Sequence, residues 1–258
     1  MIEWVESQSV AGIALLVFGF CYALAAAVFA AAAGFARRPA VAAALKATTP
    51  VMLTPLAVIA GLLIAFLASR VWANLDRANA LVAQEAGALR EALVLADALP
   101  DDTGTTLRDA MGSYLRFVVA EDFPAMAKGR AELREPPALL EAMGALLAFS
   151  PSEPRTQLVR DRASAAVERV AEARRGRVLL SRSIIAPIQW AVVVLLDVLL
   201  LAVIAMVHVD RLATAAVSQF ILSTAVASCL MLLMANDRPF GAGGLTVQPH
   251  ALREIGLE

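Results

Sequence analysis

The chain has 258 residues, of which 60% are hydrophobic and 17% are charged, and its formal net charge is −1. Its mean hydropathy of +0.71 is far from that of a soluble globular domain. The near-neutral net charge implies no strongly charged partner. Because no basic patch with interleaved aromatic residues occurs, nucleic acid is also excluded. We therefore expect a membrane protein whose main partner is the lipid bilayer.

Four stretches are apolar over about 20 or more residues, which is enough to cross a bilayer. They cover residues 10–34, 51–72, 184–208 and 212–234. The first is too long for the apolar region of a signal peptide, and the charges before it are acidic, so we expect a retained transmembrane helix. Its small residues recur at helical spacing, which favours close helix–helix packing.

These spans predict a division of the chain into four parts. Two transmembrane hairpins, 1–72 and 183–235, flank a polar domain at 73–182, and a polar tail covers 236–258. An even number of spans places both termini and the polar domain on one side. More arginines near membrane ends lie on that side than on the other, although Arg37 and Arg38 argue against this. We therefore expect a multi-pass protein of the inner (plasma) membrane with cytoplasmic termini.

The second span is predicted to continue as one helix into the polar domain, because no proline follows Pro55 until Pro100. Such a helix is roughly 70 Å long. Apolar residues at 4-3-4-3 spacing in 82–96 and 159–173 predict helices that pack in a bundle. No stretch has a convincing β pattern. The predicted fold is an all-α membrane protein, with four transmembrane helices in two hairpins flanking a helical cytosolic insert.

Local signals predict the remaining helix boundaries. Pro100-Asp101-Asp102 predicts a turn, after which Thr105 or Thr106 caps a helix. Phe123-Pro124 is predicted to kink or end that helix, and Pro136-Pro137 to open the next. Pro187 marks a bend or a new helix start. Residues 36–50, with three basic residues around an apolar run, are typical of a short interfacial helix.

No enzyme motif occurs in the chain. It has no HExxH, GxSxG or P-loop sequence, and the glycines at 241–244 do not stand between a strand and a helix. Cys21 and Cys229 lie in apolar spans without partner histidines, so we expect small packing residues and neither a disulfide nor a zinc site. We predict no enzyme activity, no metal site and no cofactor.

Polar residues within the spans are few, and each allows two interpretations. Asp197 is the one ionisable group deep in a span, where a carboxylate is costly unless it is paired, protonated or in contact with water. It is therefore a candidate ion-pathway residue or a hydrogen-bond partner between helices. Gln219, Ser223 and Ala227 share one helix face and are predicted to bond to a neighbouring helix or to face water.

The second span resembles the pore helix of the bestrophin channels. Bestrophins carry a proline, a glycine six residues later and an Arg-x-Trp nine residues after the glycine. Here these are Pro55, Gly61, Arg70 and Trp72. The Asn-Pro-Phe-Gly segment after the fourth span of bestrophins is similar to a segment here that ends in Pro239, Phe240 and Gly241.

The chain is most similar to the bacterial bestrophin-like proteins of the DUF4239 group. These share a Glu-Ala-x-x-Leu motif, here starting at Glu85, and a segment like Glu121-Asp122-Phe123-Pro124-Ala125-Met126. The resemblance covers most of the chain. It implies a homopentameric channel for inorganic ions with an axial pore.

In bestrophins, three pore-helix residues four apart form a hydrophobic neck, and the resemblance places them at Thr54, Val58 and Leu62. Such a row lies on one helix face, and symmetric copies would form rings around the axis. An apolar ring can gate by dewetting. These side chains are smaller than those typical of bestrophins, which suggests a wider neck. The alternative is that the row packs against a neighbouring helix.

The resemblance leaves selectivity open, because animal bestrophins resemble chloride channels whereas bacterial relatives are expected to pass cations. The acidic run that holds calcium in animal bestrophins is missing after Gly241, so we expect no calcium gating. A different class of function is also compatible with the sequence. The protein would then be a non-conducting membrane scaffold whose cytosolic domain binds a partner.

Overall fold

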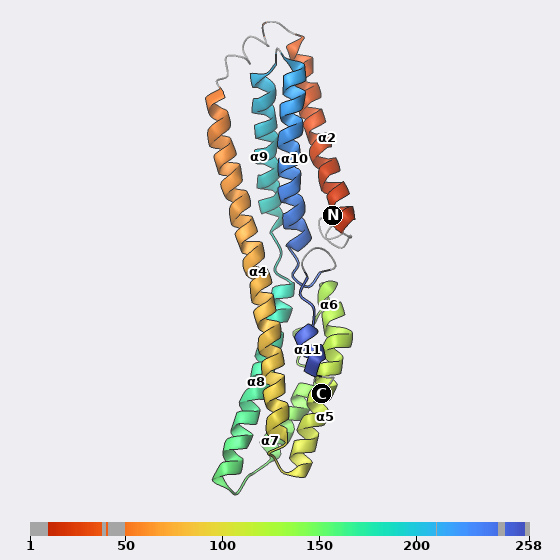
Figure 1. The fold of residues 1–258 in the computed structure, drawn as a ribbon, viewed down its shortest axis with the longest axis vertical. Helices are drawn as coiled ribbons and strands as arrows, with labels where there is room; N and C mark the ends of the chain where they lie inside the picture. Colours follow the sequence, from red (N-terminus) through yellow and green to blue (C-terminus); the bar gives the residue numbers. More distant parts are fainter. Residues whose placement is uncertain (1–9, 38–39, 41–49, 210, 242–245, 256–258) are drawn as a thin grey trace. The chain divides into compact units, whose positions relative to one another are not determined.

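The computed structural model describes residues 10–37, 40, 50–209, 211–241 and 246–255. These residues form helices and turns and contain no strand, which confirms the all-α prediction. Four helices are long and apolar enough to span a membrane, as predicted (Figure 1). They are α2 (Val10–Ala36), α4 (Leu53–Ala96), α9 (Pro187–Val207) and α10 (Leu212–Asn236).

The described residues divide into two compact units. The membrane unit comprises 10–37, 50–72 and 184–237, and the insert unit comprises 73–183, 238–241 and 246–255, within the bounds of the division. Helix α4 is continuous over 44 residues. Its residues up to Trp72 belong to the membrane unit, and those from Ala73 onward belong to the insert unit. The predicted continuation of the second span as one helix is therefore confirmed.

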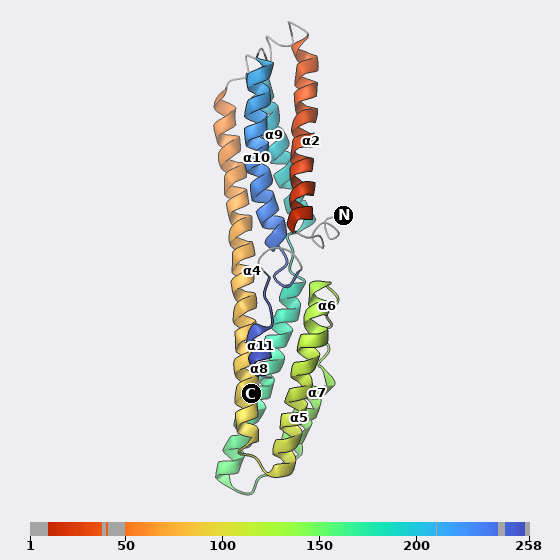
Figure 2. The same cartoon turned by 45° about the vertical axis from the view of Figure 1, so that its right-hand side comes forward.

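In the membrane unit, α2, α9 and α10 lie side by side (Figure 2). Tyr22 of α2 stacks on Phe220 of α10 with ring centroids 5.4 Å apart. Gln219 is buried and donates to the Leu201 carbonyl of α9 at 3.1 Å, so the predicted bond to a neighbouring helix is confirmed. Cys21 is buried as predicted, whereas Cys229 is exposed.

The insert unit is built on the second part of α4 and on five further helices around one apolar core. They are α5 (Asp101–Phe117), α6 (Phe123–Ala127), α7 (Pro137–Ala148), α8 (Pro154–Ser181) and α11 (His250–Ile255), and a π-helical turn, η2 (Val118–Asp122), precedes α6. Residues from the polar tail also enter this core, because Phe240, Val247, Leu252 and Ile255 are buried there.

Local predictions for residues 100–124 need correction, and the turn predicted at Pro100-Asp101-Asp102 is instead the start of a helix. Helix α5 begins at Asp101, so the prediction that Thr105 or Thr106 caps it is wrong; Thr106 instead donates to the Asp102 carbonyl within the helix. Asp101 and Asp102 lie in the first turn of α5, where negative side chains interact favourably with the positive end of the helix dipole. The helix that was predicted to kink or end at Phe123-Pro124 changes earlier: α5 ends at Phe117, η2 follows, and Pro124 lies in the first turn of α6.

The predicted new start at Pro187 is confirmed, since α8 ends at Ser181 and α9 begins at Pro187. Ile185, between them, donates its backbone N–H to the Asp237 carboxylate at the end of α10, at 3.0 Å. Most of the predicted interfacial helix at 36–50 lies outside the described residues.

The junction of α4 and α5 depends on Gly104. A Cβ atom at Gly104 would lie 2.4 Å from the Ala96 carbonyl oxygen, and a backbone contact cannot be relieved by a rotamer change. We expect Gly104→Ala to lower the free energy of unfolding by about 1–3 kcal/mol, measured by urea denaturation of the purified protein. Gly87→Ala is the control. Gly87 is mid-helix with no described atom within 4 Å of its Cβ position, so that change should stabilise by about 0.5–1 kcal/mol.

Candidate functional site

One face of α4 in the membrane unit is exposed within the single chain. Thr54 is exposed, Val58 is 62% exposed and Leu62 is 54% exposed. The row continues at the same spacing to Phe66, which is 65% exposed and which sequence analysis did not include. Because side chains four apart share a helix face, these four form one outward row.

The opposite face of α4 packs inside the membrane unit. Ala60, Leu67 and Val71 are buried there. Of the four spans, α4 buries the smallest share of its most apolar window within the chain, 17%. The helix thus has one side committed to its own chain, and the other side is free for lipid, water or another copy.

The other motif residues of the second span have different surroundings. Pro55 lies in the first turn of α4, where a proline is tolerated. No described atom lies within 4 Å of a Cβ position at Gly61, so packing within the described chain does not require this glycine. Arg70 donates to the Gln189 side chain of α9 at 3.4 Å. Trp72 lines a cavity of about 80 Å³ with Cys229 of α10.

Pro239, Phe240 and Gly241 form a turn in the insert unit. The Pro239 carbonyl accepts from the Val247 N–H at 2.8 Å. Phe240 is buried, and its ring makes a T-shaped contact with that of Phe123, at 5.8 Å between centroids. A Cβ atom at Gly241 would lie 3.3 Å from the Arg238 carbonyl oxygen. This motif therefore anchors the start of the tail in the insert core.

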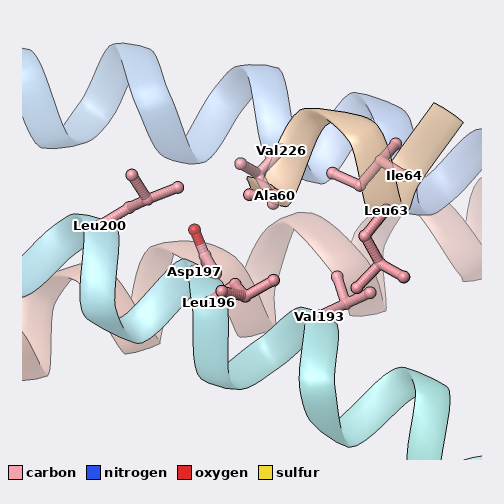
Figure 3. Close-up of a pocket in the computed structure, with 8 residues that line it drawn as sticks. All are labelled: Ala60, Leu63, Ile64, Val193, Leu196, Asp197, Leu200 and Val226. Carbon is pink, nitrogen blue, oxygen red and sulfur yellow. The ribbon is translucent and has the colours of Figure 1, made fainter. Parts of the chain in front are cut away.

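Asp197 of α9 is buried in the membrane unit with 4% of its surface exposed. Its Oδ1 atom has no hydrogen-bond partner among the described residues. The carboxyl group points away from α9 into a small cavity between α4, α9 and α10 (Figure 3). Ala60 belongs to the buried face of α4, so Asp197 lies behind α4 and away from Thr54, Val58 and Leu62.

A buried charge network in the insert unit is the site that sequence analysis missed. Arg177 of α8 donates to both oxygens of Glu85 on α4, at 2.8 and 3.0 Å, and both side chains are fully buried. Arg177 also donates to Asp122 at 3.0 Å. Arg174 of α8 also belongs to this network. The network then contains two guanidinium groups and two carboxylate groups, so its formal charges balance.

The second half of the network joins α8 to the η2 turn and to the loop after α6. Arg174 donates to both Asp122 oxygens, at 3.2 and 2.8 Å, and to the Arg134 and Glu132 carbonyls. Asp122 ends η2, where the extra residue per turn redirects the side chains that follow. Nearly all hydrogen-bonding capacity of the two arginines is thus used inside the protein.

The sequence contained a signal for this network. The 4-3-4-3 apolar stripe of α8 continues from Ala173 to position 177, where an arginine stands. A charged residue on a core stripe requires a buried partner. Glu85 and Asp122 lie in the two short motifs shared with the DUF4239 group. Those motifs therefore contain both acids of the network.

Tyr114 of α5 completes the network by donating to Glu85 at 2.6 Å. Burial raises the pKa of the Tyr114 hydroxyl well above its usual value of 10.0, and the nearby Glu85 carboxylate adds to the rise. For Arg177, burial lowers the pKa, but Glu85, Tyr114 and Asp122 together raise it above its usual value, so the guanidinium stays charged.

Tyr114→Phe is expected to lower the free energy of unfolding by about 1–2 kcal/mol at neutral pH, because Glu85 loses one donor. A tyrosine pKa that is raised by folding contributes stability below about pH 10, and that stability is lost as pH rises further. The wild type should therefore destabilise more steeply above about pH 10 than the variant. Urea denaturation across alkaline pH measures this, and equal slopes for both proteins would contradict it.

No group of three or more His, Cys, Asp or Glu side chains among the described residues is arranged to hold a metal ion. A family model, the Bestrophin-like domain, matches residues 19–252 of the chain. Comparison with curated proteins finds no match, and comparison with solved structures also finds none.

Proposed function

Because the chain belongs to the bestrophin-like family, whose domain covers residues 19–252, we propose that this membrane protein forms an ion channel. Several copies, five if it assembles as bestrophins do, would surround an axial pore. Inorganic ions would pass through this pore down their concentration gradients. Membership of the family favours a channel over an enzyme. We further propose that the protein resides in the inner membrane with cytoplasmic termini.

The observation that carries this proposal is the outward row on α4. Thr54, Val58 and Leu62 lie on one exposed face and are not used for packing within the described chain. In a symmetric assembly each would occur as a ring, and two of the three rings would be apolar. A narrow apolar constriction can exclude water and so control conduction.

Gly61 supports the same arrangement. It lies beside Leu62, and no described atom approaches its Cβ position. Small residues at helix surfaces in membranes allow close contact with a neighbouring helix. We propose that this contact is with the α4 helix of the next copy.

Flux measurements test the proposal directly. The purified full-length protein is reconstituted in liposomes, and chloride, sodium and potassium fluxes are measured separately. We expect flux of at least one of these ions above that of empty liposomes. Absence of all three fluxes, when a known channel conducts in parallel, would contradict the channel function.

A membrane scaffold is the second candidate function, and one feature of the insert unit favours it. Leu140 and Leu147 are 58% and 73% exposed on α7. They are seven residues apart, so they lie on nearly the same face of that helix. Exposed apolar surface of this kind can bind a partner, although one pair of leucines is weaker support than the family match.

A further inference from the structure

The surroundings of Asp197 are entirely aliphatic within its cavity. The cavity has a volume of about 10 Å³, which is room for about one water molecule. Its other lining residues are Ala60, Leu63, Ile64, Val193, Leu196, Leu200 and Val226. Figure 3 shows the carboxyl oxygen among these side chains. None of them can donate a hydrogen bond to the buried Oδ1 atom.

The titratable groups around Asp197 do not compensate its charge. Helices α4 and α10 contribute only aliphatic side chains to the cavity. From α2, the Cys21 thiol is close enough to interact electrostatically with Asp197, and it carries no positive charge. Among the described residues, no Lys, Arg or His forms an ion pair with Asp197.

An ionised carboxylate without a donor or a cation is strongly disfavoured at membrane depth. Aliphatic walls and room for about one water molecule cannot hydrate an ionised carboxylate, so a protonated carboxyl group fits this cavity. We propose that Asp197 is a proton-binding site of the membrane unit: it holds a proton while α4 packs against α9, and it releases that proton to water when α4 moves away.

This site would also make conduction depend on pH, an inference that rests on the proposed channel function. Asp197 faces the buried side of α4, and the opposite side of the same helix carries Val58 and Leu62. Ionisation would draw water or a cation into the seam between α4 and α9. The displaced α4 would then carry its outward row away from the axis and widen the neck.

The first test does not depend on conduction. Infrared spectra of the reconstituted full-length protein are recorded while the pH is raised. We expect a C=O stretching band of a protonated carboxylic acid that persists at neutral pH, disappears at alkaline pH and is missing in Asp197→Asn. A spectrum identical in wild type and variant would overturn the proton site. If the variant does not assemble, the band is assigned with Asp197→Ser, and its absence from the wild type would equally overturn the site.

The second test measures ion flux as a function of pH. Flux through the wild type should rise severalfold from acidic to alkaline pH, whereas Asp197→Asn should stay at the low level throughout. Ser223→Ala is the control, and it should retain the pH dependence. Ser223 is fully buried in the same unit, and its Oγ atom also has no hydrogen-bond partner among the described residues.

The two tests separate the inference from the function on which it rests. If wild type and Asp197→Asn respond equally to pH, the gating role is contradicted while the channel function stands. If neither protein conducts any ion but the Asp197-dependent infrared band is present, the channel function is contradicted while the proton site stands.

Discussion

Val58→Trp is expected to reduce ion flux to the level of empty liposomes while the protein remains folded and assembled. Val58 is the second of the four residues in the outward row on α4 and is 62% exposed. If symmetric copies bring this row to the axis, one tryptophan per copy fills the neck. The same reasoning predicts that Leu62→Ala raises the flux, because a wider apolar ring holds water more easily.

Ile59→Trp is the matched control for this prediction. Ile59 is apolar and 54% exposed on the same helix, but it points about 100° away from Val58 around the helix axis. We expect the ion flux through Ile59→Trp to remain near that of the wild type. Thr54→Trp should behave like Val58→Trp, because it lies on the same row.

Size-exclusion chromatography in detergent, run beside the flux assay, decides between the two candidate functions. A channel variant should keep the wild-type elution volume and lose conduction. If Val58→Trp conducts normally, or if Ile59→Trp blocks equally well, the row does not line the pore. If Val58→Trp fails to assemble and the wild type conducts no ion, the scaffold function is favoured.

Arg177→Met is expected to lower the free energy of unfolding by about 3–5 kcal/mol, because Glu85 would remain as a buried charge without its partner. Both side chains are fully buried. Of the donors to Glu85 in the described residues, Tyr114 would then remain. Denaturant unfolding of the full-length protein in detergent, followed by circular dichroism, measures the change.

An exposed ion pair that also joins α8 to α4 is the control for Arg177→Met. Arg169 of α8 and Glu91 of α4 are 2.9 Å apart, with side chains 44% and 42% exposed. Removing such a pair typically changes stability by about 1 kcal/mol or less, so Arg169→Met should be nearly silent. Equal losses for Arg177→Met and Arg169→Met would contradict the role of burial.

The double variant Glu85→Gln with Arg177→Met separates the cost of an orphaned charge from the value of the pair. Without the carboxylate, most of the penalty should disappear. The double variant should therefore be more stable than Arg177→Met alone, since neighbouring sites are not additive. If the two losses simply add, Glu85 and Arg177 are not energetically coupled.

Features that depend on neighbours in the sequence were predicted well. The four spans follow from hydropathy, and the starts of α7 and α9 follow from Pro137 and Pro187. The start of α5 was missed because Asp101 and Asp102 suit both a turn and the first turn of a helix. The η2 turn was missed because a single extra residue leaves almost no periodic signal.

Thr54, Val58 and Leu62 were predicted to share one helix face, and their role in lining a pore stays a prediction. Whether the row faces an axis depends on other copies, which no local pattern specifies. The location of Asp197 behind α4 also required the structure, because the direction of a side chain around α9 has meaning only once its neighbours are placed.

The amino-acid sequence by itself determined that the chain is an all-helical membrane protein with four spans, because hydropathy and helical period are local properties. Only the tertiary structure decided which polar groups meet. Glu85 and Arg177 are 92 residues apart in the chain, and burying them is tolerable only when each satisfies the other. The same rule singles out Asp197, whose buried Oδ1 atom has no hydrogen-bond partner in the described part of the chain.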